Sequence, residues 1–205
     1  MLSLEREGAH NINFVTPTHF APSVAEAIKK ARLDGLSIPI VYNTGSYDSQ
    51  KTLEALRGLV DIYLADLKFI RSKTAMELSS AYDYPEVAKT AIAEMVHQQP
   101  APIIEGGIMR CGVIVRILLM PGHVAEAKLA VKYLFSSYGD NIYISLMSQY
   151  TPIEGMTGVL SRKVTREEYR ELTEYAVKLG VTHAFVQDSD SSDVAYIPRF
   201  NISKL

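Results

Sequence analysis

The chain has 205 residues, of which 47% are hydrophobic and 21% are charged, with a formal net charge of -2 at pH 7. A chain of this length and composition can bury a complete core, so we expect a single domain over residues 1–205. The near-neutral charge gives no electrostatic argument for nucleic acid, and no apolar run approaches a membrane span. The first residues, MLSLEREGAHN, lack the features of a signal peptide. We therefore expect a cytoplasmic protein whose partners are neither nucleic acid nor membrane.

Six short β-branched or aromatic stretches, each followed by polar residues and a helical pattern, divide the chain. They are residues 11–16 (NINFVT), 38–43 (IPIVYN), 61–66 (DIYLAD), 113–120 (VIVRILLM), 141–147 (NIYISLM) and, more weakly, 182–187 (THAFVQ). This alternation predicts parallel strands joined by right-handed crossovers, in an open barrel or a doubly wound sheet. The fold class is therefore α/β. Because sites in such folds form where the strands end, the polar residues there are the candidates for function.

Caps and prolines place the helices between these stretches. Capping-box patterns, a hydroxyl residue followed three positions later by Glu, begin at Ser23, Thr74 and Thr165. We expect Gly35 to end the helix that follows residue 23, and Asp48 or Ser49 to begin the next one. Pro85 suits the first turn of a helix over residues 86–97.

Metal sites find little support in this sequence. Its one cysteine, Cys111, excludes an internal disulfide and any multi-cysteine metal or iron–sulfur site held by one chain. The five histidines have no metal-binding spacing. The acidic stretch at residues 188–193 lacks the glycine and the terminal glutamate of an EF-hand loop, so we expect a solvated turn there.

Six segments of the chain together resemble a known family. They are HNINFVTPTHFAPSVAEAI, GLSIPIVYNTGSYDS, VDIYLADLKF, AYDYPEVAKTAI, VIVRILLMPG and SLMSQYTP. In this order they are similar to the radical S-adenosylmethionine (SAM) proteins related to the pyruvate formate-lyase activating enzyme. The resemblance implies a partial parallel (β/α) barrel, in which a [4Fe–4S] cluster cleaves SAM to a 5′-deoxyadenosyl radical. It also implies hydrogen abstraction from a partner, such as a glycyl-radical enzyme or another protein substrate.

One part of that family's pattern is missing. The family holds its cluster with a C-x-x-x-C-x-x-C motif, which this chain lacks, so we expect no [4Fe–4S] cluster on this chain alone. Three explanations stay open: a start at an internal Met of a longer protein, which we favour, a split protein whose partner supplies the cysteines, or a decayed homologue. A missing first unit would leave residues 11–16 as an edge strand, which predicts homodimerisation or higher association through that edge or through the uncovered interior of the barrel.

The resemblance implies a SAM-binding role for three charged residues. Asp66 and Lys68 close the third stretch and match an Asp and a Lys of the family's SAM pocket. Arg116 lies within an apolar run, and because a guanidinium keeps its charge it requires an anion, which the resemblance identifies as the SAM carboxylate. The alternative is a purely structural ion pair, with Arg116 held by Asp66 or Glu105.

Further candidates follow the other strands. They are Thr16, Thr18, His19, Asn43, Thr44 and Gln149. Residues 16–19 stand where the family carries a G-G-E motif for the SAM amino group, although the hydroxyl of Thr18 also suits a helix cap. Residues 43–44 replace the D-T of the family's D-T-N-G, which removes one negative charge. Gln149 is expected at the mouth of the pocket, unless its segment is only a rigid turn.

Two other functions are compatible with these residues. One is a non-catalytic scaffold that binds SAM or a nucleotide. The other is a cofactor-free barrel hydrolase or lyase, in which Asp66, Lys68 and Glu105 transfer protons.

Overall fold

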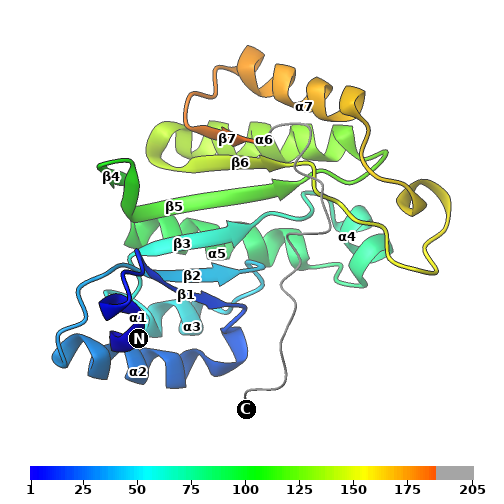
Figure 1. Ribbon diagram of the computed structural model, residues 1–205. Coiled ribbons are helices and arrows are strands. Elements are labelled where there is room, and N and C mark those ends of the chain that lie inside the picture. Colours follow the sequence, from blue (N-terminus) through cyan, green and yellow to red (C-terminus); the bar gives the residue numbers. More distant parts are fainter. Residues whose placement is uncertain (188–205) are drawn as a thin grey trace.

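A mainly parallel sheet forms the centre of the protein (Figure 1), in a computed structural model that describes residues 1–187. The acidic stretch 188–193 lies outside these residues. The strands are β1 (Ile12–Val15), β2 (Ile40–Thr44), β3 (Ile62–Asp66), β4 (Ile103–Glu105), β5 (Ile108–Leu118), β6 (Tyr143–Met147) and β7 (Ala184–Val186). Their order is β1-β2-β3-β5-β6-β7, all parallel, and β4 pairs with β5 in the antiparallel direction. The six predicted strands and the α/β class are confirmed.

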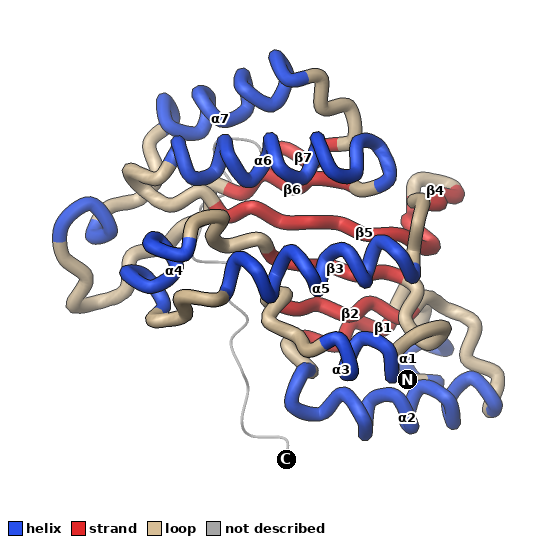
Figure 2. The backbone as a smooth tube through the Cα atoms, turned by 180° about the vertical axis from the view of Figure 1, so that it is seen from behind, coloured by secondary structure: helices blue, strands red, loops and turns tan. Residues whose placement is uncertain are grey.

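Several helices lie together on one side of this sheet. The helices are α1 (Leu2–Arg6), α2 (Ala21–Leu33), α3 (Gln50–Ala55), α4 (Ser72–Ser79), α5 (Tyr84–Gln98), α6 (Val124–Tyr138) and α7 (Arg166–Leu179). Figures 1 and 2 show α2, α3, α5 and α6 on the same face, with the sheet behind them in Figure 2. The sheet is not closed. The arrangement is therefore the open partial barrel and not the doubly wound sheet, which has helices on both faces.

Alternation along the strands separates two environments. Side chains that point toward the helices, such as Tyr42, Tyr63 and Val115, are fully buried. Near the carboxyl ends of the strands, those that point the other way, such as Asp66 and Arg116, are half-buried. We call this second side, which none of the helices within residues 1–187 covers, the open face of the sheet. It carries the polar residues expected to form a site.

Two of the predicted capping boxes are wrong. Helix α2 begins at Ala21, directly after a 3-10 turn at Thr18–Phe20, so Ser23 lies inside its first turn. Helix α4 begins at Ser72 after Arg71, so Thr74 is not its cap. In contrast, the Thr165 box is complete at the start of α7 and the Ser49 side chain caps α3.

A hairpin that the sequence analysis did not predict precedes the middle of the sheet. Strand β5 begins at Ile108, five residues earlier than expected, and folds back on β4 through a turn at Gly106 and Gly107 with φ of +58° and +81°. Only glycine adopts such angles readily. Figure 1 shows this hairpin at the amino-terminal end of β5, away from the ends where the other loops gather.

The first strand is an edge strand, as predicted. Strand β1 pairs with β2, and no other strand within residues 1–187 pairs with it. Helix α1 is attached elsewhere: the Glu5 carboxylate accepts hydrogen bonds from the backbone amides of Ser37 and Ile38, at 2.9 and 3.1 Å. Association through the β1 edge stays a prediction. In the part of the chain described here, no helix combines the length and apolarity needed to cross a membrane.

Candidate functional site

A polar group joins the carboxyl ends of three neighbouring strands on the open face. Asp66 of β3 and Arg116 of β5 are register partners, and Arg116 Nε donates a hydrogen bond to Asp66 Oδ1 at 2.7 Å. Arg116 Nη2 donates to Oδ1 of Asn43, on β2, at 2.8 Å. The side chains of Asp66 and Arg116 are 22% and 23% exposed, so solvent screens this ion pair less than a surface pair. We call these three residues the Asn43–Asp66–Arg116 group.

The guanidinium of Arg116 retains donor capacity. Its Nη1 donates to no acceptor in the described part of the chain, whereas Nε and Nη2 are both bonded. A guanidinium offers five N–H donors and is not deprotonated in proteins. This nitrogen can therefore bind an oxyanion without breaking the bonds to Asp66 and Asn43.

Lys68 places a second cation beside the same carboxylate. Its Nζ lies 4.0 Å from Asp66 Oδ2, and its side chain is 52% exposed. A pocket of about 230 Å³ opens here, lined by Asp66, Lys68, Phe69, Arg116, Leu118, Met120 and Met147. Ligand pockets commonly measure about 300–1,000 Å³, so this one holds part of a larger ligand. Its cations, Lys68 and Arg116, suit an anionic group of a ligand, and its apolar side chains suit an apolar part of the same ligand.

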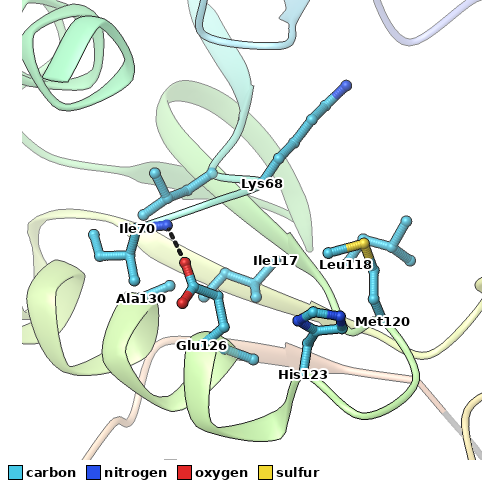
Figure 3. A pocket seen from close by; sticks show the side chains of 10 residues that line it. Lys68, Ile70, Ile117, Leu118, Met120, His123, Glu126 and Ala130 are labelled. Atoms are coloured by element: carbon cyan, nitrogen blue, oxygen red, sulfur yellow. Dashed lines mark hydrogen bonds between the residues drawn. The ribbon is translucent and has the colours of Figure 1, made fainter. Parts of the chain in front are cut away.

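The turn that carries Lys68 is fastened to helix α6. The buried carboxylate oxygen Glu126 Oε1 accepts hydrogen bonds from the backbone amides of Ile70 and Arg71 at 2.7 and 2.8 Å. Figure 3 shows the carboxylate of Glu126 directed at Ile70, while the Lys68 side chain extends away from both. Glu126 therefore fixes the backbone of the turn and leaves Lys68 accessible.

A second carboxylate at the same edge of the sheet is buried among hydroxyl groups. Asp48, which is 3% exposed, accepts hydrogen bonds from Thr18 Oγ1 at 2.8 Å and from Tyr42 Oη at 3.0 Å, and Thr44 Oγ1 donates to its other oxygen. Burial, and the negative charge of Asp48, raise the pKa of Tyr42. We call these four residues the Asp48 cluster. It ties the loop after β1 to the loop after β2.

The candidates from the sequence thus fall into three sets. Those brought together on the open face are Asn43, Asp66, Lys68 and Arg116. Thr18 and Thr44 belong to the Asp48 cluster, on the covered side. Thr16 adjoins the first set, since its amide donates to the carbonyl of Asn43 at 2.8 Å. His19, in the 3-10 turn before α2, and Gln149, in the loop after β6, are both exposed, and Gln149 Nε2 lies 4.0 Å from the sulfur of Met147.

Glu105 does not belong to the site. It lies on β4 and pairs with Arg110 at 3.3 Å. Its register partner is Ile108, eight residues before Arg116 on β5, which at about 3.3 Å per residue places it roughly 26 Å away. The expectation that Glu105 transfers protons with Asp66 and Lys68 is therefore wrong, and so is the one that it holds Arg116.

Comparison with known proteins identifies the fold. No family model matches the sequence. The uncharacterized protein MJ0674 of Methanocaldococcus jannaschii is 27% identical over 178 residues, which are 85% of this chain and 48% of that protein. The chain thus spans about half the length of the curated relative it matches. A crystal structure of a domain of pyruvate-formate lyase-activating enzyme from Bacteroides vulgatus matches with a TM-score of 0.62 at 15% identity, over 87% of this chain and 98% of that domain.

This chain has the fold of an activating-enzyme domain. Streptococcus suis SuiB, in a structure bound to the precursor peptide SuiA, matches as well, with a TM-score of 0.59 at 12% identity. That match covers 91% of this chain and 40% of SuiB. The partial barrel implied by the family resemblance is confirmed at the level of fold.

The residues of this chain do not fit a [4Fe–4S] cluster. Such clusters are anchored by several thiolates, and the sequence has only Cys111. Cys111 lies in the first half of β5, at the opposite end of that strand from Arg116. No group of three His, Cys, Asp or Glu residues within positions 1–187 is arranged to hold a metal ion. Cluster chemistry is therefore not assigned to this chain by itself.

Proposed function

We propose that this chain binds SAM on the open face of its sheet, through the Asn43–Asp66–Arg116 group and Lys68. The observation that carries the proposal is the unused Nη1 of Arg116, held at the carboxyl ends of parallel strands in an activating-enzyme fold. Ligands of parallel α/β sheets bind at these strand ends. An anion here would meet two cations without requiring any existing hydrogen bond to break.

The chemical groups of SAM match those of the pocket. Its carboxylate would accept hydrogen bonds from Arg116 Nη1 and from the Lys68 ammonium, which are charge-assisted and therefore strong. Its ammonium would be attracted to Asp66, whose Oδ2 accepts no hydrogen bond from residues 1–187 and has Lys68 4.0 Å away. Apolar parts of the ligand would contact Leu118, Met120 and Met147, which line the same pocket.

Two activities are consistent with SAM binding. In the family that the sequence resembles, a cluster cleaves SAM to a radical that abstracts hydrogen from a protein or peptide partner. For this chain, such chemistry requires cysteines supplied by another polypeptide or by a longer form of the protein. The second candidate is a SAM-binding scaffold without catalysis of its own, which is compatible with the single cysteine of this chain. The two structural matches, one of them bound to a peptide, favour a protein or peptide partner in either case.

Calorimetric titration with SAM tests the proposal. The wild-type chain should bind SAM, and Arg116→Ala should weaken binding at least about tenfold, because a charge-assisted hydrogen bond contributes about 1.5–3 kcal/mol. Arg57→Ala is the matched control: Arg57 also pairs with a carboxylate, Glu94, at 2.6 Å, but away from the open face. Equal affinities for wild type and Arg116→Ala, or no binding by the wild type, would contradict the proposed site. The gene sequence upstream of Met1 separates the two candidates, because an in-frame C-x-x-x-C-x-x-C motif there would supply the cysteines that cluster chemistry requires.

A further inference from the structure

A buried tyrosine connects the ends of β2 and β3 beside the candidate site. Tyr84, the first residue of α5, is 5% exposed. Its hydroxyl oxygen accepts a hydrogen bond from the backbone amide of Lys68 at 3.0 Å. The same oxygen lies 2.9 Å from the carbonyl oxygens of both Gly45 and Asp66, to which it donates its single proton. One phenol thus meets three backbone groups from two loops.

These contacts begin where the hydrogen bonds of the sheet stop. The amide of Leu67 still bonds across to the carbonyl of Arg116 at 2.9 Å. The next amide, that of Lys68, lies past the end of β3 and donates to the Tyr84 hydroxyl instead. Because buried backbone donors need an acceptor, the hydroxyl replaces the strand neighbour that is missing at this point. Its removal would free the backbone at the residue that carries the site's second cation.

The ring of Tyr84 is held in place independently of its hydroxyl. It packs edge-on against Phe69, with centroids 5.6 Å apart, and stacks on Tyr47 at 5.9 Å. Tyr47 donates a hydrogen bond to Asp83 at 2.7 Å. A change from tyrosine to phenylalanine at this position would therefore preserve the packing and remove only the hydrogen bonds.

We infer that Tyr84 is a positioning residue, whose hydroxyl holds Asp66 and Lys68 in the arrangement that receives the amino-acid part of SAM. Tyr84 fixes the turn at Lys68, and Glu126 fixes it again at Ile70 and Arg71. Both attachments use backbone amides, so the Lys68 side chain remains exposed to a ligand. The inference rests on the proposed SAM site and adds the means by which that site is kept in shape.

The test compares two ligands in wild type and Tyr84→Phe. Calorimetry with SAM should show affinity reduced by about tenfold in the variant, the usual effect of losing a hydrogen bond that orders a site. Calorimetry with 5′-methylthioadenosine, which lacks the amino-acid part, should show no change. A general loss of structure would weaken the binding of both ligands alike. A change in the ratio of the two affinities therefore reports a loss of positioning of Asp66 and Lys68.

Tyr63→Phe is the matched control. Tyr63 is also a buried tyrosine on this sheet, but its hydroxyl bonds to Gln98 at 2.6 Å, on the covered side. Its substitution should leave the ratio of affinities unchanged. Equal SAM affinity in wild type and Tyr84→Phe would overturn this inference but not the proposed function. An equal loss of affinity for both ligands would do the same. Absence of SAM binding by the wild type would instead overturn the proposed function.

Hydrogen exchange on the wild-type chain gives an independent measurement that needs no variant. The amide of Lys68 has Tyr84 as its hydrogen-bond acceptor and should exchange slowly, like the neighbouring amide of Leu67. Fast exchange at Lys68 together with slow exchange at Leu67 would show that Tyr84 does not hold the turn, and would contradict the inference.

Discussion

Two aspartates at the same edge of the sheet differ in every feature that bears on function. Asp48 follows β2, points to the covered side, is 3% exposed and is bonded to three neutral hydroxyl groups. Asp66 ends β3, points to the open face, is 22% exposed and lies between two cations, Arg116 and Lys68. Proximity to the carboxyl ends of parallel strands is common to both. The side of the sheet on which each lies separates them.

The difference shows what a carboxylate does in each setting. A buried carboxylate among hydroxyls completes a network in which each donor depends on the same acceptor, so it holds loops together. A half-exposed carboxylate that orients an arginine leaves that arginine available to a ligand. We therefore expect substitutions at Asp48 to act on stability and substitutions around Asp66 to act on binding.

The largest effect is expected for Asp48→Ala. It leaves the hydroxyls of Thr18, Tyr42 and Thr44 without their acceptor, and a broken buried polar network of this kind costs about 3–5 kcal/mol. Urea unfolding monitored by circular dichroism measures this loss. Asp48→Asn keeps one acceptor oxygen and should lose less. An Asp48→Ala chain as stable as the wild type would remove the distinction between the two aspartates.

A third carboxylate, Glu168 of α7, extends the comparison to pH. Hydrogen bonds from Arg162, then from the amides of Thr165 and Gly122, lower the pKa of Glu168 to about 2. Because the pKa of this group is lower in the folded state, the ionised carboxylate stabilises the fold above the unfolded pKa of about 4.5, and this stabilisation is lost as the pH falls toward 2. With allowance for the exposure of Arg162, we expect the ionised carboxylate to contribute on the order of 2 kcal/mol to the free energy of unfolding.

Unfolding of Glu168→Gln and wild type at several pH values measures this contribution. The difference in unfolding free energy between them should be largest above about pH 5 and should shrink below about pH 4. A difference that is constant across this range would show that the charge of Glu168 does not stabilise the fold.

The smallest effect on stability is expected at Lys68. Its side chain is 52% exposed and 4.0 Å from Asp66, so Lys68→Ala should change the unfolding free energy by no more than about 0.5 kcal/mol. SAM affinity should nevertheless fall a few-fold, and the difference from wild type should diminish at high salt, which screens an exposed charge. Unchanged affinity at low salt would exclude Lys68 from the site.

The strands and the polar edge were predictable because both are local in sequence. The run VIVRILLM predicts a buried strand with one polar residue, Arg116, and this residue is central to the candidate site. The hairpin of β4 and β5 was missed, although Gly106 and Gly107 between isoleucine-rich segments are a recognisable turn signal.

The partners of the side chains could not be predicted in the same way. The sequence indicated Asp48 as a possible helix cap, yet its carboxylate accepts hydrogen bonds from the hydroxyls of residues 4, 6 and 30 positions away. The roles of Tyr84 and Glu126 depend on helices that fold back over the turn after β3. Tyr84 lies 16 residues after its partner Lys68, and Glu126 lies 56 residues after its partner Ile70. Such contacts follow from tertiary packing, on which hydrophobic periodicity carries no information.

The most direct test of the open-face site is a nuclear magnetic resonance titration of the 15N-labelled chain with SAM. We expect the Arg116 Nε–H and Asn43 side-chain amide signals to shift, together with the backbone amide of Lys68, because these groups surround the anion-binding position. The amides of Gly106 and Gly107, at the far end of β5, should not move. Saturation with SAM that leaves the Arg116 and Asn43 signals in place, or that shifts only residues outside the open face, would contradict the account.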